Sequence, residues 1–218
     1  MELFNLPYNT IIQRFVAKSH FDSVTNTKQK ALFTNDIAKI MWCNTLSTET
    51  TNLPHKEIEE IQIFSIELKE RKEIKSILEI IDKTIPYHII FIVTFGDEVY
   101  LSASAKHPSP LNDNKSVIDW TYTSPWFKEI ENTYSLNLKK DIDTVFLDFC
   151  QQLSIKSSIS IKNIADLTAY NSRFSSLTKE IELLKKKIST CPQFNKKVEL
   201  NLKLKKIIEE LDKLINIL

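Results

Sequence analysis

Glycine is nearly absent from this chain, since Gly96 is the single glycine in 218 residues. Loops that wrap around phosphate groups need glycine, because their backbone must approach the ligand closely or adopt positive φ angles. A Walker loop, a dinucleotide-binding fingerprint and a glycine-flanked nucleophilic serine are therefore all missing. Their absence excludes the ATPases, kinases, Rossmann dehydrogenases and α/β-hydrolases that depend on such loops.

Arginine, cysteine and long apolar runs are also scarce. Arginine occurs only at Arg14, Arg71 and Arg173, which disfavours base-specific DNA readout, because arginine most often makes the paired hydrogen bonds to guanine. The three cysteines are dispersed and the four histidines lack metal-ligand spacing, so we expect reduced thiols and neither a metal nor another cofactor. No apolar run is long enough to span a bilayer, and the N-terminus lacks the pattern of a signal peptide. We therefore expect a cytoplasmic protein without membrane contact.

The apolar residues follow periodic patterns that predict an α+β fold. Residues 60–69 have apolar side chains on both faces, which is typical of a central strand covered on both sides. Gly96 and Asp97 separate two further apolar strands, and a glycine in the first position suits a type II′ turn. We expect a small mixed β-sheet with flanking helices. Its elements are helices at 27–46, 70–84 and 141–153, strands at 60–69, 87–95 and 99–105, and a loop at 107–118.

The C-terminal residues carry the clearest helical pattern. Apolar residues recur at alternating steps of four and three from Tyr170 to Ile188 and again from Leu200 to Leu218, with Pro192 between the two runs. Two helical runs joined by a short connector predict an antiparallel helical hairpin, a coiled coil. We therefore expect an α/β body at 1–153, a linker at 154–165 and the hairpin at 166–218.

A Glu-x-Lys sequence ends the predicted central strand. Glu67 and Lys69 would share one face of that strand, as in restriction-type nucleases, where the glutamate holds Mg²⁺ and the lysine positions water. That chemistry needs another acid on a neighbouring strand, and residues 44–59 contain only glutamates outside any convincing strand. Solvated charges at a strand exit are the simpler interpretation, and a magnesium-dependent nuclease is the alternative.

Two other groups of residues are candidates for binding. The segment at 119–127 contains Trp120, Tyr122 and Trp126, which would either anchor the fold or form a stacking platform for single-stranded nucleic acid. The predicted hairpin is locally basic, and its lysines would either be solvated or contact phosphates. These lysines are Lys185, Lys186, Lys187, Lys196 and Lys197.

Six stretches along nearly the whole chain form one ordered set: residues 30–33, 37–42, 60–69, 81–91, 122–126 and 193–201. Together they resemble the bacterial family catalogued as domain of unknown function 4391. Asp82-Lys-Thr-Ile-Pro86 and residues 193–201 are the most specific of them. The resemblance implies no established activity. It does imply a context, in which such proteins accompany helicase and DNA methyltransferase genes of restriction or phage-defence clusters.

These observations lead to one main hypothesis and two alternatives. We expect a non-enzymatic accessory subunit of a bacterial defence or DNA-processing system, which docks a helicase or methyltransferase through its hairpin. The alternatives are a magnesium-dependent nuclease that uses Glu67 and Lys69, and a single-stranded nucleic-acid binder. Self-association through the hairpin stays open.

Overall fold

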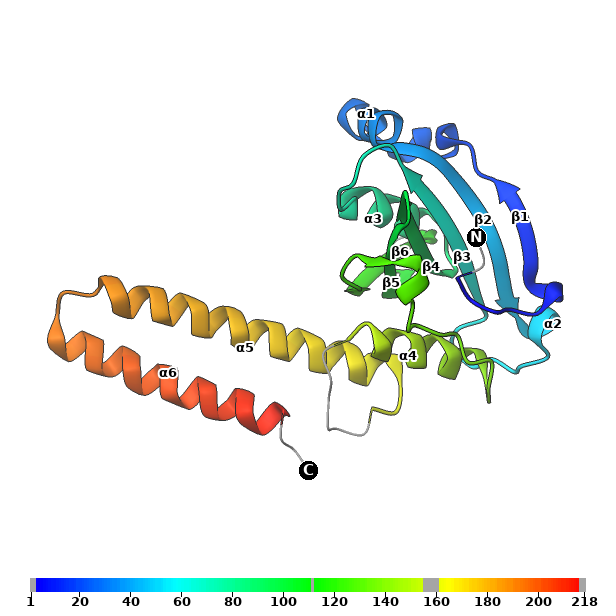
Figure 1. The fold of residues 1–218 in the computed structure, drawn as a ribbon. Coiled ribbons are helices and arrows are strands. Elements are labelled where there is room, and N and C mark those ends of the chain that lie inside the picture. Colours follow the sequence, from blue (N-terminus) through cyan, green and yellow to red (C-terminus); the bar gives the residue numbers. More distant parts are fainter. Residues whose placement is uncertain (1–2, 111, 155–160, 216–218) are drawn as a thin grey trace. The chain divides into compact units, whose positions relative to one another are not determined.

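The computed structural model describes residues 3–110, 112–154 and 161–215, which fall into two compact units (Figure 1). The first unit is Met1–Ser154 and the second is Ile155–Leu218. Residues 155–160 of the expected linker and Leu218, the last position of the expected hairpin seam, lie outside the described residues. Within the described part, no helix combines the length and the apolar character that a bilayer crossing requires.

The first unit contains a mixed sheet with the strand order β1-β2-β3-β4-β5-β6, and β7 pairs with β5. All neighbouring strands are antiparallel except β3 and β4, which run parallel. The helix α3 (Lys75–Thr84) connects this parallel pair, as a crossover must. The strands are β1 (Ile11–Phe15), β2 (Ile37–Ser47), β3 (Glu60–Leu68), β4 (His88–Phe95), β5 (Glu98–Ser109), β6 (Asn112–Thr123) and β7 (Phe127–Lys128).

Helices cover the sheet and complete the core. The apolar face of α3 buries Ile77 and Ile81 in one cluster with Phe64 of β3. The helix α4 (Ile142–Gln152) buries Phe146 and Phe149, and the Phe146 ring lies against the His88 ring of β4. The expected mixed sheet with flanking helices is therefore confirmed. The remaining helices of this unit are α1 (Thr27–Asp36) and α2 (Thr48–Thr51), with 3₁₀ turns at Tyr8–Thr10, Lys18–Val24 and Glu129–Glu131.

The single glycine lies in the tight turn that was expected between two strands. Phe95 of β4 pairs with Glu98 of β5, which leaves Gly96 and Asp97 as the turn. Gly96 has a φ angle of 60°, whereas Asp97 is not among the residues with positive φ. A positive φ at the first turn residue only is the signature of type II′.

Two predictions from the sequence were wrong. Residues 37–46 form β2 and not the second half of a helix, because α1 ends at Asp36. Bulges interrupt the β2–β3 register near Ile37 and Trp42, and each bulge shifts the inward-facing positions by one residue. The buried residues of β2 therefore do not alternate as they do in a regular strand, and their spacing resembles that of a helix. Residues 107–109 and 112–118 likewise belong to β5 and β6, with bulges around Pro108 that accommodate the missing N–H.

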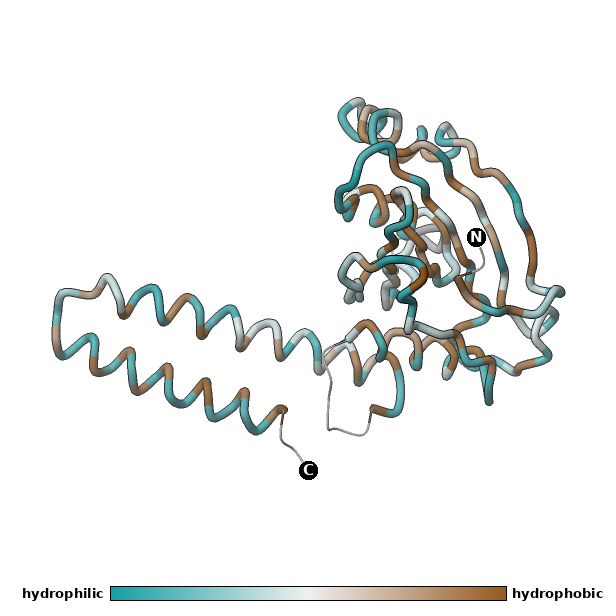
Figure 2. Tube along the Cα trace, viewed as in Figure 1, coloured by the Kyte–Doolittle hydropathy of each residue, from teal (hydrophilic) through white to brown (hydrophobic). Residues whose placement is uncertain are grey.

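The second unit is helical, as expected for the C-terminal region. It consists of α5 (Ile164–Thr190) and α6 (Phe194–Ile215), and Asn163 caps the start of α5 by accepting a hydrogen bond from the Asp166 N–H. Figure 2 shows hydrophobic residues recurring along both helices. Leu177, Ile181, Leu184 and Ile207 form one buried cluster, against which Leu200, Leu204, Leu211 and Leu214 pack.

Candidate functional site

Glu67 and Lys69 lie close in sequence, but they have different surroundings. Glu67 is exposed near the end of β3, and its in-register neighbours are Lys39 of β2 and Thr94 of β4. These three residues help to line a cavity of about 390 Å³. Lys69 does not line that cavity, and its Nζ donates to the Thr34 carbonyl oxygen at 2.7 Å. The structure therefore does not bring the lysine and the glutamate together in one cavity.

A magnesium site at Glu67 would need further acidic ligands. Across the residues that the structure describes, no three His, Cys, Asp or Glu side chains are grouped so that they could hold a metal ion. The in-register neighbours Lys39 and Thr94 offer an ammonium and a hydroxyl group in place of carboxylates. The nuclease stays a hypothesis that no ligand set within the described residues supports.

The aromatic segment belongs largely to the fold. Tyr122 of β6 is 2% exposed, and Trp126 packs against the core with its ring edge-on to Tyr100, at a centroid distance of 4.7 Å. Trp120 is half-buried on β6. Because Tyr122 is buried, the segment does not present its three rings together to solvent, as a stacking platform would.

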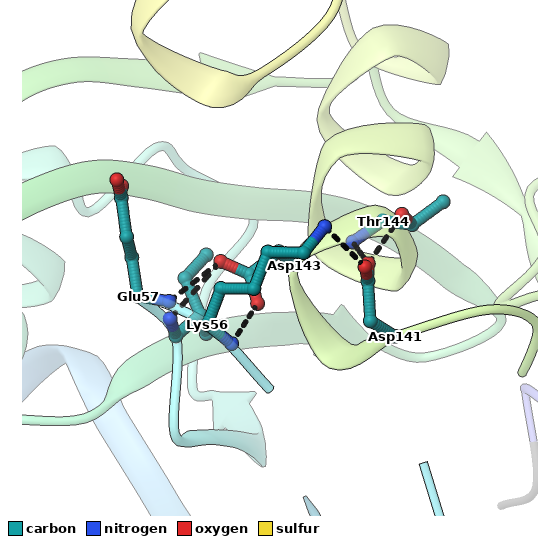
Figure 3. A network of polar contacts seen from close by, with 6 residues as sticks. Lys56, Glu57, Asp141, Asp143 and Thr144 are labelled. Carbon is teal, nitrogen blue, oxygen red and sulfur yellow. Dashed lines mark hydrogen bonds and ion pairs between the residues drawn. The ribbon is translucent and has the colours of Figure 1, made fainter. Parts of the chain in front are cut away.

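The polar network in Figure 3 fastens the loop before β3 to the start of α4. The Asp143 carboxylate accepts hydrogen bonds from the backbone N–H groups of Lys56 and Glu57, at 2.8 and 3.0 Å. Lys56 Nζ donates to Asp141 at 2.6 Å, and Asp141 also caps α4 by accepting from the Thr144 N–H. The hydrogen bond from Lys56 is the main cause that lowers the pKa of Asp141 to about 2. Both carboxylate oxygens of Asp141 and of Asp143 accept hydrogen bonds that hold the fold together.

A second ionic group, fully buried, anchors the end of α3. Lys106 of β5 and Asp82 of α3 have side chains that are both 1% exposed. Lys106 Nζ donates to the Asp82 carboxylate, the Asp82 carbonyl oxygen and the Ile85 carbonyl oxygen, each at 2.7 Å. The helical partner of the Asp82 carbonyl would be residue 86, which is a proline and has no N–H. Lys106 therefore replaces a missing backbone donor, which is a structural task.

The end of the second unit where α5 meets α6 is basic. Five exposed lysines lie there, in the last turns of α5 and the first turns of α6, and none of them forms an ion pair with a described residue. Farther along α6, by contrast, Lys203 pairs with Glu180 at 2.8 Å. The five are Lys185, Lys186, Lys187, Lys196 and Lys197, the lysines that the sequence singled out.

The helix α6 also carries a row of exposed apolar side chains, which the sequence analysis missed. Phe194, Val198 and Leu202 are 78%, 44% and 59% exposed. Their spacing of four residues places them along one side of α6, and we name them the outer stripe. Lys197 and Lys206 fall on the two sides of this stripe, at 3.6 residues per turn. The same spacing is present in the sequence, but the seam that begins at Leu200 has the longer and more regular pattern.

Comparison with known proteins finds a family match. The family model described as Domain of unknown function (DUF4391) matches residues 4–211, which is nearly the whole chain. No curated protein and no solved structure matches. The match assigns no chemistry to the cavity at Glu67, to the lysines or to the outer stripe.

Proposed function

We propose that the chain, which belongs to the family described as Domain of unknown function (DUF4391), is a non-enzymatic accessory subunit. In this proposal it docks a larger protein through α5 and α6. The partner is a helicase or a DNA methyltransferase of a bacterial defence or DNA-processing system in the cytoplasm. This partner class follows from the sequence resemblance, and copurification tests it.

In this proposal α5 and α6 form an antiparallel coiled-coil hairpin. Two ion pairs support that arrangement, because Arg173 pairs with Glu210 and Glu180 pairs with Lys203. The residue that lies later in α5 thus pairs with the residue that lies earlier in α6, as antiparallel helices require. The heptad spacing of the seam and a connector of three residues around Pro192 agree with a hairpin.

The observation that carries the proposal is the outer stripe. Its side chains are apolar and exposed in a continuous row, whereas single exposed apolar residues are common and need no explanation. Burying a Phe, Val or Leu side chain fully contributes about 1.5–3 kcal/mol, so a partner that covered the stripe would gain several kcal/mol. Because Lys197 and Lys206 flank the stripe, we expect an amphipathic partner helix with acidic residues beside its apolar face.

The experiment is copurification with a co-expressed helicase or methyltransferase from the same gene cluster. Phe194→Ser combined with Leu202→Ser should abolish recovery of the partner, while circular dichroism shows unchanged helix content. Leu183→Ser is the matched control, because Leu183 is 58% exposed on α5 and lies outside the stripe. Removal of the chain from residue 166 onward should also abolish recovery. Undiminished recovery with the stripe variant, or equal loss with the Leu183 control, would overturn the proposal.

A further inference from the structure

An apolar pocket opens beside the edge strand β1 in the first unit. Its volume is about 480 Å³, within the range of roughly 300–1,000 Å³ that is usual for small-molecule sites. Four segments that are distant in sequence line it: the stretch from Arg14 to His20, β2, β3, and the residues after α3. The ring-bearing residues of the lining are Phe15, His20, Trp42, Phe64 and Tyr87.

One wall of the pocket is preformed by two packed rings. Trp42 of β2 and Phe64 of β3 are register partners, and their rings are nearly parallel, with an interplanar angle of 8°. The Trp42 indole N–H donates to the Asn44 carbonyl oxygen at 3.1 Å, which satisfies the donor and fixes the ring. Phe15 and Tyr87, 59% and 39% exposed, remain accessible to solvent beside this wall. Because Phe64 is 2% exposed and Arg14 lies over the indole, the ring surface most open to a planar ligand is that of Phe15 and Tyr87.

Arg14 provides the charge at this pocket. Its guanidinium carbon lies 5.9 Å from the centroid of the Trp42 ring, and the Arg14 side chain forms no ion pair or hydrogen bond with any residue in the described part of the chain. Arg71 shows the contrasting case, because it lies 5.0 Å from the Trp126 ring and also binds Glu98 through two nitrogens, at 2.6 and 3.0 Å. Both arginines lie over a tryptophan, but of the two only Arg71 is held by a carboxylate.

We propose that this pocket binds a planar aromatic ring that carries a phosphate, as a nucleoside monophosphate does. The ring would stack against Phe15 or Tyr87 beside Trp42, and the phosphate would take the forked N–H donors of Arg14. A site of this kind needs no glycine-rich loop, because a side chain and not the backbone binds the anion. The inference is independent of the docking function proposed for α5 and α6, since all lining residues belong to the first unit.

Isothermal titration calorimetry of the full chain tests the ligand class, with adenosine 5′-monophosphate as the probe. We expect saturable binding with a Kd below about 1 mM. Adenosine, which lacks the phosphate, should bind at least about 10-fold more weakly, because a charge-assisted hydrogen bond is lost. Inorganic phosphate alone should not bind. A 5′-phosphorylated dinucleotide distinguishes the two sources of this chemistry, because tighter binding indicates a nucleic-acid end and equal binding indicates a free nucleotide.

Variants and NMR locate the site. Arg14→Gln should weaken binding of the monophosphate about 10-fold and remove its advantage over adenosine, whereas Arg71→Gln should leave both affinities unchanged. The indole N–H resonance of Trp42 should shift on titration, and those of Trp120 and Trp126 should not. The proposal fails if the monophosphate does not bind, if Arg14→Gln has no effect, or if the Trp42 resonance stays in place.

Discussion

Replacing Lys106 by methionine should strongly destabilise the first unit. The substitution keeps a long side chain but removes an ammonium whose three hydrogen bonds go to the Asp82 carboxylate and to the carbonyl oxygens of Asp82 and Ile85. Both charged side chains are 1% exposed, so water cannot replace the lost donor. The variant must therefore bury an unpaired carboxylate and two unsatisfied carbonyl groups.

The expected loss is several kcal/mol. Removing one partner of a buried ion pair costs about 3–5 kcal/mol, because the remaining charge is left without compensation. For a protein of this size each kcal/mol lowers the melting temperature by roughly 2–4 °C, so we expect a decrease of about 6–20 °C in a thermal melt. Lys83→Met is the matched control. Lys83 forms an exposed pair with Glu79, and losing it should cost less than about 0.5 kcal/mol.

The loss should also depend on pH. Burial raises the pKa of Asp82, while the nearby Lys106 opposes that shift, so removal of Lys106 should raise the pKa of this carboxyl group further. A folded-state pKa above the unfolded value means that the folded protein binds more protons in the interval between the two values. The stability of the variant therefore falls as pH rises through that interval. We expect Lys106→Met to be closer to the unchanged protein at pH 5 than at pH 7.5.

A double variant separates the charge from the packing. Asp82→Leu combined with Lys106→Met removes both charges, and it should be at least about 1 kcal/mol more stable than Lys106→Met alone. Full recovery is not expected, because the carbonyl oxygens of Asp82 and Ile85 still lack their donor. The reasoning is refuted if Lys106→Met melts within the range of the Lys83 control, or if the double variant is no more stable than the single one.

Two further predictions concern the turn and the loop clamp. Gly96→Val should lower the melting temperature without any change in ligand or partner binding, because a β-branched residue at φ 60° costs about 1–3 kcal/mol. Gly96→Asn should lower the melting temperature clearly less, because asparagine tolerates positive φ. Equal decreases for the two variants would contradict this account. The pKa of Asp141 is about 2 in the folded protein, against about 3.9 in an unfolded chain, so its carboxylate stabilises the fold above about pH 4 and loses that effect as pH falls towards 2. Urea unfolding at pH 7 and pH 3 should show a smaller acid-induced loss of stability for Asp141→Asn.

The central strands could be predicted because their apolar residues are consecutive and both faces are buried. Residues 61–64 of β3 are all buried, and so are residues 89–94 of β4, which is what a sheet covered on both sides requires. The turn at Gly96 could be predicted from the local sequence, because glycine stands at the one turn position that needs a positive φ angle. The bulged strands could not be predicted in this way. A bulge is defined by pairing with the partner strand and has no signal in the local sequence.

Because residues 37–46 were predicted as a helix and not as β2, the pocket beside β1 could not be predicted either. As part of a helix, Trp42 would have no register partner, and nothing in the sequence would place it beside Phe64. Arg14 and Tyr87 are likewise distant in sequence from both residues and join them only through the sheet and the segment after α3. The outer stripe of α6 differs, because its spacing of four is local and could have been read from the sequence alone.

The scarcity of glycine has a structural consequence at the pocket. Among the residues that the structure describes, three other than glycine adopt positive φ: Gln13, Asn52 and Lys140. Asn52 follows α2, where asparagine is a common terminator, but Gln13 has φ 51° inside the irregular stretch of β1 between Ile11 and Arg14. A left-handed residue with a long side chain costs about 1–2 kcal/mol, and bulges of this kind change the direction of the next side chain. The strain in β1 thus lies immediately before Arg14, the uncommitted cation of the pocket. Such placement is typical of strain at a binding site and adds support to the assignment of Arg14 as the anion-binding residue.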